Sequence, residues 1–90
     1  MYLAKVTGAI VSTTKHESLI GTKLLVVSRM DANHQITGYP EIAVDCVGAG
    51  NGEVVIVAVG SSARKSREQV NSVIDAAVVG IVDSLEVNDD

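Results

Sequence analysis

Gly48, Gly50 and Gly52 alternate within the stretch DCVGAGNGEVVIV, residues 45–57. Glycine-rich loops bind phosphate when they pass it to the N-terminus of a following helix, where free N–H groups and the helix dipole attract anions. Here the spacing is GxGxG rather than GxGxxG, the next residues EVVIVAV form a strand-like run, and no GK[ST] sequence occurs. The pattern therefore favours a chain turn over a nucleotide site.

Asn51 and Gly52 are the preferred pair for a type I′ turn, because both central positions of that turn need a positive φ. The pair predicts a β-hairpin whose turn is flanked by Gly50 and Glu53. The expected register places Val47 opposite Ile56, Cys46 opposite Val57 and Val44 opposite Val59. One face then carries Val44, Cys46, Val55, Val57 and Val59, and the other carries Ala43, Val47, Ala49, Val54, Ile56 and Ala58, with Asp45 alone polar.

Ser61 and Ser62 in GSSAR are the candidate nucleophiles. The G-x-S-x-G elbow needs a second glycine, which this stretch lacks, so we expect turn or capping hydrogen bonds instead. His16, His34 and Cys46 lack the i, i+4 or CxxC spacing of metal sites, so we expect surface histidines and a buried thiol. The sequence thus predicts no catalytic residue, no metal site and no cofactor.

Three aspartates, Asp45, Asp75 and Asp83, stand beside or within apolar runs. An acid–base pair is one interpretation. The other is a structural partner for Arg64, because an Arg–carboxylate fork across a subunit boundary is directional and strong once desolvated. We prefer the second; an Arg64→Ala variant that left the oligomer intact would argue against it.

The composition indicates one small β domain over residues 1–90, with an acidic, solvated tail at about 86–90. Sixteen Val and seven Ile stand against five Leu, and there is no Phe or Trp; branching at Cβ favours strands. The net charge of −4 disfavours binding to nucleic acid or an anionic membrane. A single cysteine, Cys46, suggests a reducing compartment, and neither a signal peptide nor a membrane span is recognisable.

Five apolar segments are expected as strands, separated by polar stretches with Gly or Pro. They are residues 2–12, 23–30, 41–48, 53–59 and 76–87. Gly8 and Gly80 lie inside such runs and suggest bulges or bends. We expect one short helical turn near residues 62–68. Several runs are apolar on both faces, which a solvated antiparallel sheet is not, so copies of the chain are expected to cover one another.

The segments LAKVTGAIVSTTKHESLIGTKLLVV, AVDCVGAGNGEVVIVAVGSSAR and IDAAVVGIVDSL together closely resemble the vertex proteins of bacterial microcompartment shells, the EutN/CcmL type. The resemblance runs from Met1 to about Leu85. It implies a mainly all-β, five-stranded OB-like barrel that forms a homopentamer. The pentamer would plug the corners of a polyhedral shell in the bacterial cytoplasm, beside hexameric shell proteins, with no enzyme activity. The motif positions implied to shape the subunit and its contacts are Asp45, Gly48, Gly50, Gly52, Glu53, Gly60, Ser61, Ser62, Ala63, Arg64, Asp75, Gly80 and Asp83.

Two other functions remain open at the level of sequence. An OB-like barrel suits single-stranded nucleic acid, but that activity uses stacked aromatics and a basic groove, and only Tyr2 and Tyr39 are present. A small-ligand-binding enzyme subunit is the third. A discrete ring of five times 9.4 kDa supports the shell function, a monomer with a salt-sensitive DNA shift supports the second, and turnover of a metabolite supports the third.

Overall fold

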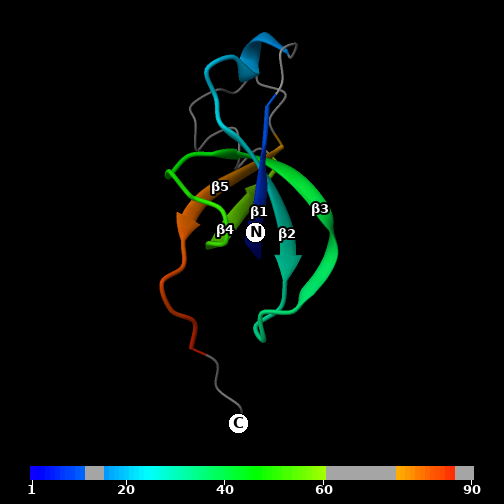
Figure 1. Ribbon diagram of the computed structural model, residues 1–90, viewed down its shortest axis with the longest axis vertical. Coiled ribbons are helices and arrows are strands. Elements are labelled where there is room, and N and C mark those ends of the chain that lie inside the picture. The colour runs from blue at the N-terminus through cyan, green and yellow to red at the C-terminus, as the bar shows by residue number, and fades with distance from the viewer. Residues whose placement is uncertain (12–15, 61–74, 87–90) are drawn as a thin grey trace.

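The computed structural model describes residues 1–11, 16–60 and 75–86. These ranges contain five strands and one short 3₁₀ helix, joined by turns and loops (Figure 1). The elements are β1 (Tyr2–Ile10), η1 (Glu17–Leu19), β2 (Leu24–Met30), β3 (Ile36–Asp45), β4 (Val54–Val59) and β5 (Ala76–Ile81). Within these ranges no helix is long and apolar enough to cross a membrane. The helical turn expected near 62–68 and the end of the expected acidic tail, 87–90, lie outside the described residues.

The strands close into a barrel in the order β1-β2-β3-β5-β4. Neighbouring strands are antiparallel except β3 and β5, which are parallel and pair at only two positions, Val44 with Ala77 and Asp45 with Val78. Closure removes most of the unpaired edges that an open sheet of this size would expose. The expected five-stranded all-β barrel is confirmed.

The predicted hairpin between the third and fourth strands is wrong. β4 pairs with β1 and β5, not with β3, so the expected pairing of Val47 with Ile56 and its neighbours does not occur. Asn51 has no positive φ, whereas Gly52 does, and a type I′ turn needs both. The competing interaction is the β1 ladder: Gly52 N–H donates to the carbonyl of Val6, and Val6 N–H donates to the carbonyl of Glu53.

Two strand boundaries differ from expectation by five residues or more. β3 begins at Ile36 rather than residue 41, and β5 ends at Ile81 rather than residue 87. The earlier start of β3 follows from a tight turn, in which the Asp31 carboxylate accepts the N–H groups of Asn33 and Gln35 and His34 adopts a φ of 65°. This turn lies at the end of the barrel opposite η1 (Figure 1). Pro40 therefore lies within β3 rather than in a loop.

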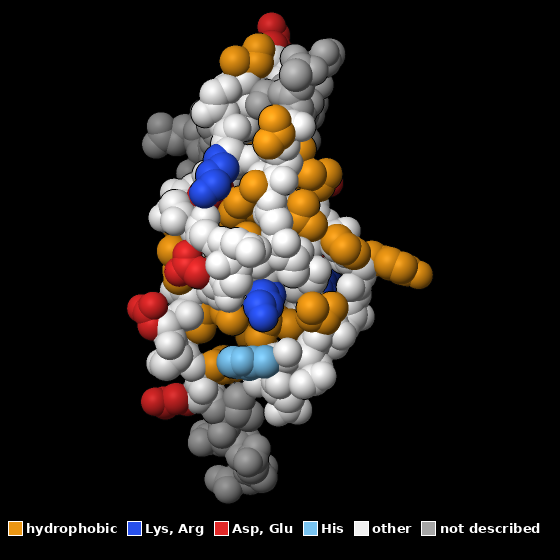
Figure 2. Space-filling model, viewed as in Figure 1, with side chains coloured by type: hydrophobic (Ala, Val, Ile, Leu, Met, Phe, Trp, Pro, Cys, Tyr) orange, Lys and Arg blue, Asp and Glu red, His pale blue; other side chains and the backbone are white. Residues whose placement is uncertain are grey.

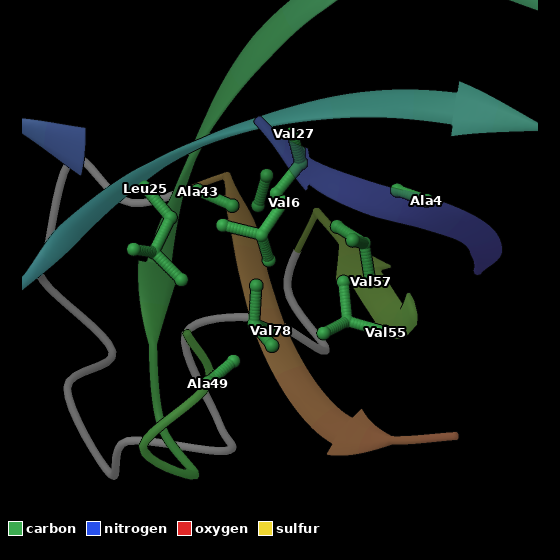
Figure 3. Close-up of a cluster of buried hydrophobic side chains, with 10 residues drawn as sticks. Ala4, Val6, Leu25, Val27, Ala43, Ala49, Val55, Val57 and Val78 are labelled. Atoms are coloured by element: carbon green, nitrogen blue, oxygen red, sulfur yellow. The ribbon is translucent and has the colours of Figure 1, made fainter. Parts of the chain in front are cut away.

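The barrel interior is filled by small aliphatic side chains that point toward one another (Figure 3). Leu25 is the only leucine in this cluster; its other members are Ala4, Val6, Val27, Ala43, Ala49, Val55, Val57, Ala76 and Val78. Successive strand residues point to opposite faces, so their neighbours lie outside. The two expected faces are wrong as sets, because the hairpin does not form. Val55 and Val57 are buried together as expected, but Ala43 and Ala49 from the other expected face lie in the same interior cluster. Val44 lies in the outer cluster instead, and Val59 and Cys46 are exposed.

A second apolar cluster lies on the outside of the barrel. Leu24, Val44 and Ala77 are its buried members, with Ile10, Leu19 and Val79 partly buried against them. The barrel is therefore apolar on both faces where β2, β3 and β5 meet, as the sequence predicts.

Two glycines mark irregularities in the ladders. The β1–β2 register shifts between Val6 and Gly8, and the β4–β5 register shifts where Gly80 pairs with Ile56. A Cβ on Gly80 would lie 3.3 Å from the Ile56 Cδ1 atom, so glycine permits this close approach. The bulges expected at Gly8 and Gly80 are confirmed, and they bend the strands toward closure.

One end of the barrel is closed by a polar cluster from three strands. Tyr2 packs against the core, and the Arg29 guanidinium lies 3.8 Å from the centre of its ring. The Tyr2 hydroxyl donates to Glu41 Oε2 at 3.1 Å, and Arg29 Nη2 lies 3.6 Å from Glu41 Oε1. Burial, and then the hydrogen bond to Glu41, raise the pKa of Tyr2 above its ordinary 10.0.

Tyr2→Phe should lower the free energy of unfolding by about 0.5–1.5 kcal/mol at neutral pH, because one hydrogen bond is lost. The raised pKa means that the folded chain keeps the phenolic proton to higher pH than the unfolded chain. The wild type should therefore lose stability as pH rises through the folded pKa, while the variant loses less. Urea unfolding at neutral pH and above pH 10, at fixed protein concentration, measures both effects. Tyr39→Phe, at an exposed ring, is the control and should match the wild type at neutral pH.

Candidate functional site

The glycine-rich loop is organised around the carboxylate of Asp45, the last residue of β3. Asp45 Oδ1 accepts the N–H groups of Val47 at 3.1 Å, Gly48 at 3.0 Å and Ala49 at 3.2 Å. Gly48 makes this possible because its φ of 81° turns the chain back toward the carboxylate. The Asp45 side chain is only 3% exposed, so the loop wraps a buried anion of its own.

The second half of the loop is closed by Glu53. Its Oε1 accepts the Gly50 N–H at 2.6 Å, and its own N–H donates to the Gly50 carbonyl at 3.2 Å. Gly52, at the third position of this four-residue turn, has a φ of 86°, which is the type II pattern. The turn therefore exists, although it differs in type from the expected one and does not join paired strands.

Lys23, just before β2, ties the loop to the barrel. Its Nζ donates to the Ala49 carbonyl at 3.1 Å and lies 3.8 Å from Asp45 Oδ2. Because the lysine side chain is 55% exposed, its ion pair with Asp45 contributes little to the stability of the loop. The hydrogen bonds that Asp45 accepts contribute more.

These contacts decide what the loop can do. A phosphate loop presents free backbone N–H groups to its ligand, but here two carboxylates of the chain itself occupy four of them. A phosphate would have to displace a buried aspartate and would meet its charge. The loop is a self-capped structural turn.

The other predicted motif residues that the structure describes do not converge on one site. Gly60 has a φ of 68°, and its N–H donates to the Asp75 carbonyl. Asp75 and Asp83 are exposed, and Gly80 lies in β5. Ser61, Ser62 and Arg64 lie outside the described residues, so the proposed pairing of Arg64 with an aspartate stays a prediction.

The candidate metal ligands are scattered. His16 and His34 are exposed as expected, but Cys46 is exposed as well, and the expected buried thiol is wrong for the single chain. The reason is that β3 ends at Asp45, so Cys46 belongs to the loop. Among the residues that the structure describes, no three His, Cys, Asp or Glu side chains come close enough to hold a metal ion.

The aromatic residues do not form a stacking platform. Tyr2 is covered by Arg29, whereas Tyr39 is 91% exposed. One exposed ring on a chain of net charge −4 lacks the repeated stacking and the basic groove that bind single-stranded nucleic acid.

The sequence analysis missed an apolar groove on the outside of the barrel. It has a volume of about 250 Å³ and lies between η1 and the strands β2, β3 and β5; its lining residues are Leu19, Leu24, Ile42, Ala43, Val44, Asp75 and Ala76. Hydrophobic side chains gather over the β2 and β3 side of the molecule (Figure 2). Alternation of Pro40, Ile42 and Val44 was the available signal, but Leu19 comes from a segment that reads as a polar loop.

Comparison with known proteins gives consistent results. A family described as "Ethanolamine utilisation protein EutN/carboxysome" matches residues 1–83. The chain is 62% identical over 86 residues to the bacterial microcompartment shell vertex protein GrpN of Rhodospirillum rubrum (strain F11), covering 96% of this chain and 97% of that protein. It is 55% identical over 89 residues to the vertex protein PduN of Salmonella typhimurium, covering 94% and 98%. The solved structure of the GrpN pentameric microcompartment shell protein superposes with a TM-score of 0.89 at 60% identity, covering 98% of this chain and 100% of that one.

Asp45→Ala should lower the free energy of unfolding by about 1–3 kcal/mol, because the buried Ala49 N–H loses its acceptor. Asp31→Ala is the matched control: that aspartate also accepts backbone N–H groups, but on an exposed turn, where water can replace the lost acceptor, so the free energy of unfolding should fall less. Urea unfolding compares them. Equal losses for the two variants would contradict the role given to Asp45.

Gly52→Ala should lower the free energy of unfolding by about 1–2 kcal/mol, because an L-residue is strained at positive φ. No atom lies within 4 Å of the added Cβ, so strain is the only cost. Gly38→Ala, at ordinary φ with its nearest neighbour at 3.8 Å, should leave stability nearly unchanged. Thermal unfolding of both variants tests this, and an unchanged Gly52→Ala variant would be evidence against the strained turn.

Proposed function

This chain belongs to the EutN/CcmL family, and we propose that it forms homopentamers that cap the vertices of a polyhedral bacterial microcompartment. The observation that carries the proposal is the likeness to the GrpN pentameric shell protein, which extends over nearly the whole of both chains. We propose that residues 1–90 form one shell domain.

The mechanism is geometric. A flat layer of hexagonal units cannot close, and a closed polyhedron needs five-fold corners. A pentamer of this chain introduces the curvature and seals the corner, so that intermediates stay inside. We propose that hexameric shell proteins contact its rim, and that the shell lies in the bacterial cytoplasm.

The proposed role is structural rather than catalytic. The glycine-rich loop is filled by Asp45 and Glu53, which supports a shaping function. We propose that the other motif positions serve the same purpose, in the subunit or at its contacts. These positions are Gly48, Gly50, Gly52, Gly60, Ser61, Ser62, Ala63, Arg64, Asp75, Gly80 and Asp83.

Native mass spectrometry of the purified chain should show one main species at five times 9.4 kDa. Coexpression with a hexameric microcompartment shell protein should give closed particles, visible by electron microscopy, and omission of this chain should give open sheets or tubes. A stable monomer would contradict the proposal; a salt-sensitive shift of single-stranded DNA or turnover of a metabolite would then point to the other two functions.

A further inference from the structure

The outer surface where β2, β3 and β5 meet is apolar and only partly covered. Leu24, Val44 and Ala77 are buried there, with Ile10, Leu19 and Val79 partly buried against them. Ile42, one pleat away from Val44, remains 56% exposed. A large aliphatic side chain left half in water beside a buried apolar cluster is typical of a surface that another molecule covers.

The 3₁₀ helix turns this surface into a groove. His16 accepts the Ser18 N–H at 3.1 Å, and the Thr22 hydroxyl donates to the Leu19 carbonyl at 2.6 Å. These contacts fix the short helix, so that Leu19 packs on the outer cluster and forms one wall. Leu24 and Ile42 line the remainder, and among the described residues Asp75 is the only charged one that lines the groove.

The symmetry of a ring indicates what fills the groove. In a pentamer each subunit meets its neighbours through two different patches, because head-to-tail contacts are heterologous. One patch must therefore receive the other, and a hollow apolar surface suits the receiving side. A membrane or a nucleic acid would need basic residues at the edge, whereas the charged residue that the described part of the edge carries is an aspartate.

We infer that the groove between η1 and the β2–β3–β5 surface is one of the two patches that form the interface between subunits, and that a second copy of this chain fills it. The inference rests on the proposed function, because it needs the ring. It adds which face of the barrel makes the contact, and it makes Ile42 the central contact residue.

A pair of isoleucines on one strand tests the inference. Ile42 and Ile36 both lie in β3 and are both 56% exposed, but only Ile42 lines the groove. Ile42→Glu should remove the pentamer from the native mass spectrum and leave monomer as the main species, because a carboxylate would be desolvated at the interface. Ile36→Glu should leave the pentamer as the main species. Circular dichroism should show wild-type secondary structure for both.

Each outcome decides a separate point. A wild-type chain that is itself monomeric contradicts the proposed function before the groove is tested. If the wild type is a pentamer and Ile42→Glu remains one, the groove is not part of the interface. If Ile36→Glu alone dissociates the ring, the interface lies at the other end of β3. Should Ile42→Glu fail to fold, Ile42→Ala replaces it: a pentamer that dissociates at higher protein concentration than the wild type supports the inference, and an unchanged one overturns it.

Discussion

The buried carboxylate of Asp45 governs how the chain leaves β3, and the strand order depends on that exit. Three N–H groups of the following loop converge on one oxygen, and Lys23 fixes the loop to the start of β2. The chain then turns at Gly52 and enters β4 alongside β1. A direct hairpin from β3 would place β4 where β5 lies. The self-capped loop therefore makes room for β5 and lets the barrel close.

The side chains inside the resulting barrel are small, and part of its outer surface is apolar. Its interior holds mainly Ala and Val, which bury little area per residue compared with aromatic side chains. The outer cluster around Val44 adds apolar surface that a single chain leaves partly wet. In the ring that we propose, association would bury this surface without enlarging the domain, and would thereby stabilise the subunit.

The strands could be predicted because runs of Val and Ile bounded by glycine are a local signal. The bulges at Gly8 and Gly80 could be predicted because a glycine inside a strand-like run is also a local signal. The absence of a hairpin between β3 and β4 could not be predicted. Asn51-Gly52 is a strong local pattern for a hairpin turn, but hydrogen bonds to Val6, which is distant in the sequence, override it. Asp45 was identified as a motif position, but its role depends on the path of the loop. Leu19 was missed because its short helix is held by side-chain caps in a polar stretch rather than by an apolar period.

The sparse pairing of β3 with β5 has a consequence for the chain before it assembles. Between β3 and β5 only Val44 and Asp45 pair, so within the described residues the earlier part of β3 has no strand on that side. An exposed edge of this kind is a template on which other chains add strands and aggregate. Pro40 lies in that stretch, and proline has a fixed φ and no N–H. Because Pro40 cannot donate an N–H at this position, that stretch of β3 is a poor template for strand addition by other chains.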